Sequence, residues 1–400
     1  MKEIVRNMTR RKLRTFLTLS GIVIGVTALT TMGALAENFN ALLDGGYRYY
    51  GSSIPITTQD GKQGNLIPLA KIDEIKAVRG VAAAFPSYMF DAKPGGHMAT
   101  FGFPDQIMSS DPGEESFTAL KTTLAQGRKI QIGDTGVVVL GYTIAGEFNM
   151  KVGSFIDLPI KPKGAKPGFL SHRFVVVGVL ERTRTAPDNF AYVSISDAQR
   201  LLEDTLPSSV KDTIDVTKIT MAINVYGAPG TSTTDLDVVA DRINDQVSEV
   251  KASRPTDVLD NLRSAGTTFT ALTTGVTLLA LLIGGLSVIN TMIMTVSERT
   301  REIGLKKAVG FRVRHILQEY LTEATLIGLI GGVVGYLLGV ALTTLLNTVE
   351  KSDNQELFLV TPALTVFAIG FAVVLGASAG VIPAMRAARL DPVAALRSTT

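Results

Sequence analysis

Apolar residues gather along this chain in four long blocks that contain no charged side chain. The blocks are residues 16–36, 269–296, 324–346 and 364–382. A helix needs roughly 20 apolar residues to cross the hydrocarbon core of a bilayer, and each block is about that long or longer. The pattern therefore predicts four membrane-spanning helices, one near the start of the sequence and three near its end.

Residues 37–265 follow a different pattern, in which alternating segments typical of strands are mixed with amphipathic segments typical of helices. Strands are predicted at residues 52–58, 81–90, 136–140, 154–160 and 174–180, helices at 68–79, 196–203 and 234–251, and a loop at 161–168. The helix that restarts at Pro255 is expected to continue into the second span. The predicted fold class is an α-helical membrane protein with four transmembrane helices and a large α+β extracytoplasmic domain, at 37–265, on helical stalks between spans 1 and 2. Two subdomains are conceivable there, with a boundary that the sequence leaves open.

Positive charge is concentrated beside the apolar blocks. Residues 1–14, 297–315 and 383–400 together hold 15 Lys and Arg against 4 Asp and Glu, although the whole chain carries a formal charge of only +3. Such basic flanks mark the cytoplasmic side and attract anionic lipid. They predict a cytoplasmic N-terminus (1–15), coupling helix (297–315) and tail (383–400), with an outer loop at 347–361. We expect a multi-pass protein of the cell (cytoplasmic or inner) membrane with both termini in the cytoplasm and with membrane lipids, not nucleic acid, as partners.

The sequence lacks several motifs and residue types that are typical of catalytic and metal sites. It has no cysteine, no G-x-x-x-x-G-K-[ST] phosphate loop and no G-x-S-x-G elbow, and its three histidines are far apart in sequence. We therefore expect no enzyme activity, no metal site and no cofactor in this chain. No span carries a charged residue near its middle, which argues against an ion-coupled transporter. The nearest polar candidates, Asn290, Glu319 and Glu323, are interpreted as structural or interfacial.

Glycines recur in the apolar blocks at spacings that bring them to one face of a helix. Small residues at such spacings let helix backbones approach closely in lipid. Helix packing is predicted for Gly21, Gly25, Gly328, Gly331, Gly332, Gly335, Gly339, Gly376 and Gly380. Packing within one chain and a seam between two copies are equally compatible with this pattern.

The segment between spans 2 and 3, SERTREIGLKKAVG (residues 297–310), is predicted to be a short charged helix. Ser297 could cap its start, and Gly310 could end it in a left-handed conformation. Glu302 and Lys306 are spaced as an i,i+4 pair. Apolar residues remain among the charges, so the helix could dock into a partner's groove, or it could be a solvated connection. The predicted coupling residues are Glu298, Arg299, Arg301, Glu302, Ile303, Gly304, Leu305, Lys306, Lys307, Val309 and Gly310, with Ile303, Leu305 and Val309 as the apolar patch.

Residues 297–324, SERTREIGLKKAVGFRVRHILQEYLTEA, closely resemble the segment that joins spans 2 and 3 in the MacB, lipoprotein-release and FtsX superfamily of ABC transporter permeases. The segments RRKLRTFLTLSGIVIGV, GVVVLGYTIAGEF, KVGSFIDL, FVVVGVL and PAMRAARLDPVAALR extend the resemblance in the same order. The resemblance implies a permease that dimerises and binds two ABC ATPase subunits through the coupling helix. ATP and Mg²⁺ would then belong to the ATPase, which is expected on a separate chain because no fused ATPase domain is found in this sequence.

The function expected from this resemblance is mechanotransmission. ATP hydrolysis by the partner would move the outer domain and drive efflux of an amphiphilic substrate such as a macrolide-like drug, a peptide or a lipid. An outer adaptor or a lipoprotein is a further expected partner. The alternatives are FtsX-like signalling across the membrane to a cell-wall hydrolase on the outer surface, and lipoprotein release.

Overall fold

The computed structural model describes residues 12–59, 66–94, 104–162, 168–211, 213–349, 357–391 and 395. It divides into two compact units. Met1–Asn38, Thr268–Val349 and Glu356–Thr400 form what we call the four-helix unit, and Phe39–Thr267 with Glu350–Gln355 form the α+β domain. Four predicted segments (1–15, 161–168, 347–361 and 383–400) lie partly outside the described residues.

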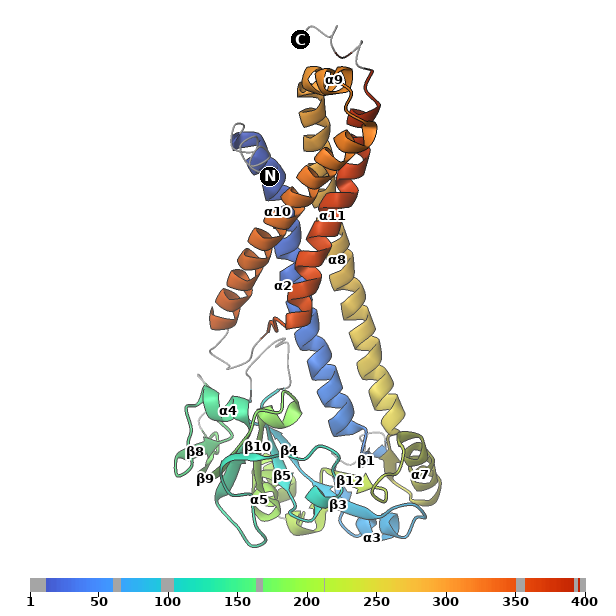
Figure 1. Cartoon of the computed structure of the whole chain (residues 1–400). Helices are drawn as coiled ribbons and strands as arrows, with labels where there is room; N and C mark the ends of the chain where they lie inside the picture. Colours follow the sequence, from blue (N-terminus) through green and yellow to red (C-terminus); the bar gives the residue numbers. More distant parts are fainter. Residues whose placement is uncertain are drawn as a thin grey trace. The chain divides into compact units, whose positions relative to one another are not determined.

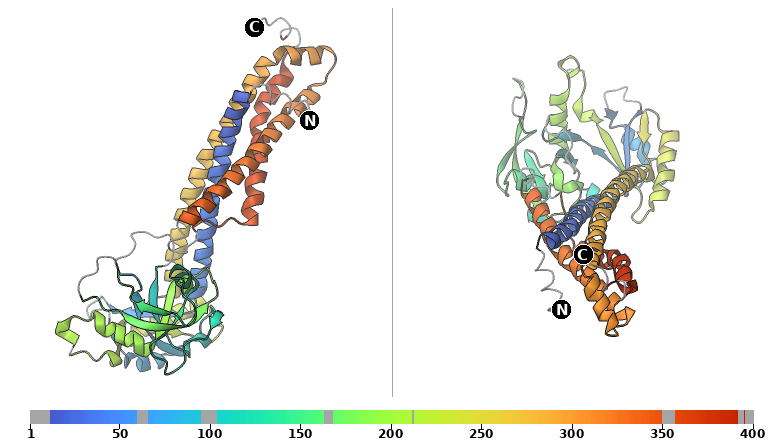
Figure 2. Two further views of the ribbon diagram at one scale, coloured as in Figure 1. Left: turned by 90° about the vertical axis from the view of Figure 1, so that its left-hand side faces the viewer. Right: turned by 90° about the horizontal axis from the view of Figure 1, so that it is seen from above.

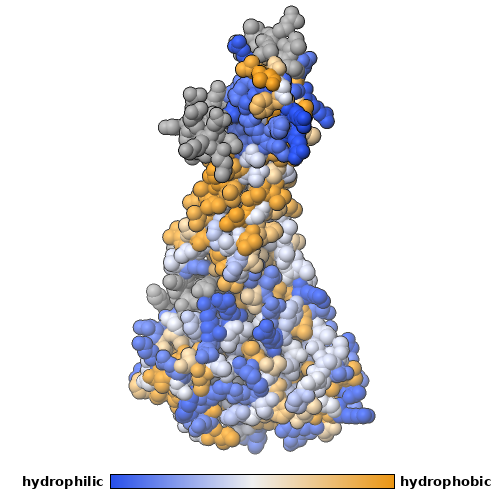
Figure 3. Space-filling view, viewed as in Figure 1, coloured by the Kyte–Doolittle hydropathy of each residue, from blue (hydrophilic) through white to orange (hydrophobic). Residues whose placement is uncertain are grey.

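Four long helices carry the apolar blocks: α2 (Lys12–Tyr50), α8 (Pro255–Glu298), α10 (Val313–Val349) and α11 (Pro362–Arg389). All four are long and apolar enough to cross a membrane. One precedes the α+β domain in sequence and three follow it, which confirms the predicted fold class and a multi-pass membrane protein. The short helix α9 (Thr300–Ala308) joins α8 to α10 and lies at the same end of the four-helix unit as the end of α11 (Figure 1). The middle of these helices is hydrophobic on its outer surface, and the α9 end is largely hydrophilic (Figure 3).

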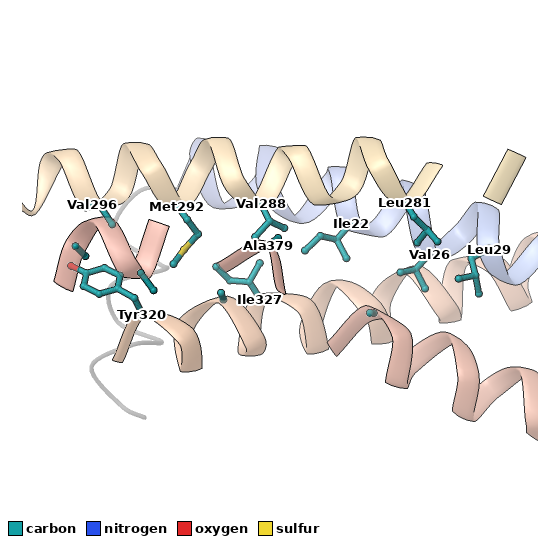
Figure 4. Close-up of a cluster of buried hydrophobic side chains, with 14 of the residues drawn as sticks. Ile22, Val26, Leu29, Leu281, Val288, Met292, Val296, Tyr320, Ile327 and Ala379 are labelled. Atoms are coloured by element: carbon teal, nitrogen blue, oxygen red, sulfur yellow. The ribbon is translucent and has the colours of Figure 1, made fainter. Parts of the chain in front are cut away.

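The interior of the four-helix unit is built from aliphatic side chains of all four long helices. Val288 and Met292 of α8 are buried together with Ile22 and Val26 of α2 and Ile327 of α10 (Figure 4). α11 contributes mainly alanines to the same cluster. The small residues of α11 let α10 and α11 run side by side along much of their length (Figure 2).

The predicted packing glycines lie where these helices touch. A Cβ at Gly328 would be 2.6 Å from the carbonyl oxygen of Ala372 and 3.0 Å from the Cα of Gly376, so α10 and α11 meet backbone to backbone. Gly332 of α10 also faces α11, and Gly376 and Gly380 of α11 face Ala324 of α10. Gly331, Gly335 and Gly339 of α10 face α2, and Gly21 and Gly25 of α2 face α8. Thr27 also donates a hydrogen bond of 3.0 Å to the Gly335 carbonyl. These glycine faces are covered by helices of the same chain.

One half of the α+β domain is a four-stranded antiparallel sheet in the order β13-β1-β12-β3. Its strands are β1 (Ile54–Thr58), β3 (Ala83–Ser87), β12 (Ala222–Tyr226) and β13 (Val250–Ala252). Because side chains alternate along a strand, Ile223 and Val225 of β12 point to one face. There they pack with Ile54 and Ile56 of β1 and with the apolar side of α7 (Thr233–Gln246), while α3 (Lys71–Lys76) adds Ile75.

The other half is a seven-stranded mixed sheet in the order β4-β5-β10-β7-β9-β6, with β8 paired to β9. Its strands are β4 (Met89–Asp91), β5 (Gln106–Ser110), β6 (Leu124–Gly127), β7 (Val137–Leu140), β8 (Phe155–Leu158), β9 (His172–Leu180) and β10 (Phe190–Ser194). Helices α4 (Tyr142–Glu147) and α5 (Ile195–Thr205) bury Ile144 and Leu201 against it. A separate two-stranded ladder pairs β2 (Ile67–Pro68) with β11 (Ile219–Thr220). α6 (Ser208–Lys211) and three short 3-10 segments, Glu114–Ser116, Ala186–Asn189 and Val216–Lys218, complete the domain.

Two sequence predictions in this domain were wrong. The strand predicted at residues 81–90 is two strands in different sheets, β3 and β4, because the chain leaves one sheet for the other at Tyr88, whose side chain is fully buried. The helix predicted at 234–251 ends at Gln246, and β13 follows it after Glu249, which has a positive φ of 68°. The strands β5, β10 and β12, central to the two sheets, were not predicted.

Candidate functional site

The helix α9 and the residues on either side of it contain all the predicted coupling residues. α8 continues to Glu298. α9 starts after Arg299, whose side chain makes no capping hydrogen bond. The predicted cap at Ser297 was wrong, since Ser297 lies inside α8 and donates its hydroxyl to the Ile293 carbonyl. The predicted stop at Gly310 is confirmed: Gly310 has a φ of 99°, and the amides of Gly310 and Phe311 bond back to the carbonyls of Lys307 and Lys306.

One side of α9 faces the interior of the four-helix unit. Ile303 is only 1% exposed and belongs to the same buried cluster as Ile316 and Tyr320 of α10. Gly304 is buried beside it. The prediction that Ile303 belongs to an exposed docking patch was therefore wrong, because the helix turns this residue toward the protein's own core.

Two basic residues connect this inward side to α10. Lys306 Nζ lies 2.7 Å from Glu319 Oε1 and 3.3 Å from Glu302 Oε1, so the predicted i,i+4 pair is present but is the longer of the two contacts. Burial alone would lower the pKa of Lys306, but the two carboxylates outweigh it and hold that pKa above its usual range. Arg299 lies 3.5 Å from Glu323, whose side chain is almost fully buried. α9 is therefore joined to α10 by charges at its start and near its end.

Lys307 connects α9 to the third C-terminal helix. Its ammonium group donates hydrogen bonds to the carbonyl oxygens of Ala388, at 2.9 Å, and Leu390, at 2.5 Å. These carbonyls lie at the C-terminal end of α11, where a helix has unpaired acceptors and its dipole favours a positive charge. Lys307 therefore caps α11 from a neighbouring helix, a contact that sequence spacing gave no means of finding.

The other side of α9 is open. Leu305 is 58% exposed and Val309 is 75% exposed, and the exposed apolar surface continues into Phe311 and Val313. Arg301, Arg312 and Arg314 are exposed around these four residues. Figure 3 shows an apolar area among hydrophilic residues at this end of the four-helix unit. We call Leu305, Val309, Phe311 and Val313 the α9 patch; Phe311 and Val313 had not been predicted, although their apolar character beside Gly310 was a visible signal.

This arrangement suits recognition of a partner. The ionisable groups behind the α9 patch, Arg299, Glu302, Lys306, Lys307, Glu319 and Glu323, are paired with one another or with helix-end carbonyls. Across the described part of the chain, no group of three or more His, Asp or Glu side chains is placed to hold a metal ion. An apolar area surrounded by arginines, on a helix fixed from behind, is the kind of surface that fits a partner's groove.

Comparison with known families agrees with the two-part organisation. Residues 15–243 match the profile of the MacB-like periplasmic core domain, and residues 274–392 match that of the FtsX-like permease C-terminal region. The second match contains α9 and the α9 patch.

Several relatives match this chain over nearly its whole length. The macrolide export ATP-binding/permease protein MacB of Marinobacter nauticus is 28% identical over 100% of this chain and 60% of its own length. MacB of Nitrobacter winogradskyi is 30% identical over 96% of this chain and 58% of its own length. The pyoverdine export ATP-binding/permease protein PvdT of Pseudomonas syringae pv. tomato is 28% identical over 98% and 58%. The chain thus spans about three fifths of the length of these relatives.

Two solved structures are similar to about half of the chain. A domain of a Porphyromonas gingivalis protein described as a permease covers 51% of this chain at 13% identity, and the extracellular domain of the noncanonical ABC-type transporter YknZ covers 50% at 12% identity. The matched regions make up 91% and 99% of those two structures. Each match has a TM-score of 0.30, which is too low to identify a fold. The family profiles, which together match most of this chain, carry the assignment. The chain belongs to the family of ABC permeases that combine a MacB-like periplasmic core domain with an FtsX-like permease C-terminal region.

Proposed function

We propose that this protein is the membrane subunit of an ABC exporter and that the α9 patch is the surface on which the ATPase docks. One observation carries the proposal: α9 has an exposed apolar side, while its opposite side is held against α10 and α11. The relatives support it, since their names join an ATP-binding part to a permease part. No phosphate loop occurs in these 400 residues. We therefore assign ATP and Mg²⁺ to an ABC ATPase that works together with this permease region.

The proposed transmission step follows from what α9 touches. A displacement of α9 by the ATPase would act on α10 through Glu319 and Glu323 and on α11 through the carbonyls that Lys307 binds. Helices packed backbone to backbone cannot deform independently, so such a displacement would move α10 and α11 together. Two populated arrangements of this unit, selected by the ATPase, are required for the step to do work.

The orientation and assembly of the subunit are also part of the proposal. We place α9 and both termini in the cytoplasm, because basic residues are concentrated there. In intact cells, a membrane-impermeant maleimide should label Leu170→Cys in the α+β domain and leave Val309→Cys unlabelled; the opposite pattern would reverse the topology. A second copy of the chain is proposed to pack on α8, whose most apolar stretch is only 22% buried within one chain, the lowest share among the four spans.

We propose an amphiphilic substrate, because both named kinds of relative are exporters, of macrolides and of pyoverdine. Export would follow from motion of the α+β domain driven through α2 and α8, the helices that continue into it.

The docking assignment is tested by placing a charge in the α9 patch. Leu305→Asp should weaken association with the ATPase more than tenfold, since an unpaired charge in an apolar contact costs roughly 2–5 kcal/mol. Leu170→Asp is a matched control, because Leu170 is 54% exposed but belongs to the α+β domain. Co-purification of the ATPase at equal membrane levels is the measurement. Unchanged recovery with Leu305→Asp, or equal loss with both variants, would refute the assignment.

A further inference from the structure

The α+β domain contains a cavity of about 380 Å³ between its two sheets. Strands β1, β3 and β12 of the first sheet and β4, β5 and β10 of the second contribute to its wall, together with the end of α2. Figure 1 shows these strands as neighbours in the domain. Ligand sites in proteins span roughly 300–1,000 Å³, so the cavity can hold a small organic molecule.

Strand alternation explains why this space exists. On β12, Ile223 and Val225 fill the first core, whereas Asn224 and Tyr226 point into the cavity. β10 follows the same rule in the second sheet, where Ala191 and Val193 fill the core and the flanking Phe190 and Tyr192 line the cavity. Each sheet therefore has one face covered by helices and one face turned to the cavity, and the cavity side carries polar and aromatic residues.

Aromatic rings form one wall. Tyr49 stands edge-on to Phe190, with ring centroids 5.9 Å apart, and Phe190 stands edge-on to Tyr192 at the same separation. Tyr50 lies against Tyr49 at 4.9 Å. Within the described residues, the structure gives the hydroxyls of Tyr49 and Tyr192 no hydrogen bond. The faces of such rings attract ammonium groups, because the ring quadrupole is negative there.

A carboxylate lies in the same cavity. Glu114 Oε1 accepts hydrogen bonds from Asn224 Nδ2, at 2.9 Å, and from the Tyr226 hydroxyl, at 2.8 Å. Its second oxygen, Oε2, has no hydrogen bond to any described residue. Burial raises the pKa of Glu114 above its ordinary value, even though the two donors act in the opposite direction. Nearby, Lys129 is paired with Glu115, so it does not neutralise Glu114.

We propose that this cavity binds a small amphiphilic amine, with its ammonium group against the open oxygen of Glu114 and its apolar part against the rings of Tyr49, Phe190 and Tyr192. A partly buried carboxylate without a cation is unfavourable, and a bound ammonium group reduces that cost. The flanking Met108 and Val139 supply apolar contact. A neutral ligand would gain the apolar contacts alone. This inference rests on the proposed function only in taking the bound amine to be an exported substrate.

The absence of tryptophan from the chain makes a fluorescent probe practical. 1-Naphthylmethylamine is the cationic probe, and 1-naphthalenemethanol is its neutral counterpart of nearly the same shape. Binding is measured by fluorescence anisotropy with the full chain in phosphatidylcholine nanodiscs, after subtraction of the signal from empty nanodiscs. The amine should bind at least tenfold more tightly than the alcohol.

Two variants locate the probe and its charge. Glu114→Gln keeps an acceptor for Asn224 and Tyr226 but removes the charge, so it should abolish the preference for the amine and leave the alcohol unaffected. Thr57→Phe narrows the cavity from an exposed position on β1 and should weaken both probes alike. If Glu114→Gln does not fold, the amine preference of the unmodified chain and the loss in Thr57→Phe still decide the matter.

Three outcomes would overturn the inference: equal affinity for the two probes, undiminished amine binding in Glu114→Gln, or binding in Thr57→Phe equal to that of the unmodified chain. The Leu305→Asp variant should bind the amine normally, because Leu305 belongs to the four-helix unit and the proposed amine site belongs to the α+β domain. Failure of amine binding with intact ATPase docking would refute this inference alone. The reverse pattern would refute only the proposed docking surface.

Discussion

The two units of this protein use small and large side chains in opposite ways. In the four-helix unit, glycine and alanine bring helix backbones together, and a Cβ added at Gly328 or Gly376 would meet the backbone of the facing helix. In the α+β domain, large aliphatic residues fill two separate cores, while aromatic and polar residues line a cavity between the sheets. The first unit is close-packed, and the second keeps an internal space.

We propose that this difference reflects a division of roles. A close-packed unit of helices transmits displacement, because its elements have few alternative arrangements. A cavity with a carboxylate and several rings has the chemistry to distinguish one ligand from another. We therefore assign transmission to the four-helix unit, starting at α9, and recognition to the α+β domain.

The largest expected effect in this comparison concerns a helix contact. Gly328→Leu should destabilise the four-helix unit by about 3 kcal/mol or more, since its side chain would have to displace the backbone of α11. Gly370→Leu is the matched control, because a Cβ there meets nothing within 4 Å. Thermal unfolding of the purified protein in detergent is the measurement. Equal stability of the two variants would contradict the close-packed interface.

A smaller effect is expected from the contact between α9 and α11. Lys307→Met removes a charged donor from the carbonyls of Ala388 and Leu390, and hydrogen bonds to a charged group contribute roughly 1.5–3 kcal/mol. The ATPase should still bind to within about twofold, since the α9 patch is untouched, but ATPase activity stimulated by the permease should fall severalfold. Lys151→Met, at an exposed position of the α+β domain, serves as control. Loss of binding and stimulation in equal measure would assign Lys307 to docking and not to transmission.

The smallest effect is expected at Glu302. Its side chain is 53% exposed, and Lys306 keeps its shorter contact with Glu319 when Glu302 is removed. Glu302→Ala should therefore change stability and ATPase association by less than about 1 kcal/mol. A loss as large as that of Leu305→Asp in the co-purification assay would show that Glu302 itself contacts the ATPase.

Features that depend on local sequence could be predicted. The four spans follow from apolar length alone, and the stop at Gly310 follows from the conformational freedom of glycine. The i,i+4 spacing of Glu302 and Lys306 gave one contact correctly. Each of these is decided within a few turns of one helix.

Features that depend on distant segments could not be predicted. Which side of α9 faces inward depends on where α8 ends. Because α8 continues to Glu298, past the predicted cap, Ser297 lies inside α8 and Ile303 faces the core. The boundary between the subdomains could not be fixed as a single position. The first sheet is built from both ends of the α+β domain, with β12 and β13 joining β1 and β3, while the second sheet occupies the middle. The cavity arises only when these sheets meet.

The central claim, that the open side of α9 receives the ATPase, is tested most directly by cross-linking from within the α9 patch. The chain has no cysteine, so Val309→Cys introduces a single thiol at a highly exposed position. After labelling with a benzophenone maleimide and irradiation in the presence of the ATPase, Val309→Cys should yield a permease–ATPase adduct, and Leu170→Cys should yield none. An absence of adduct from Val309→Cys in a complex that still co-purifies, or equal adduct from both positions, would contradict the claim.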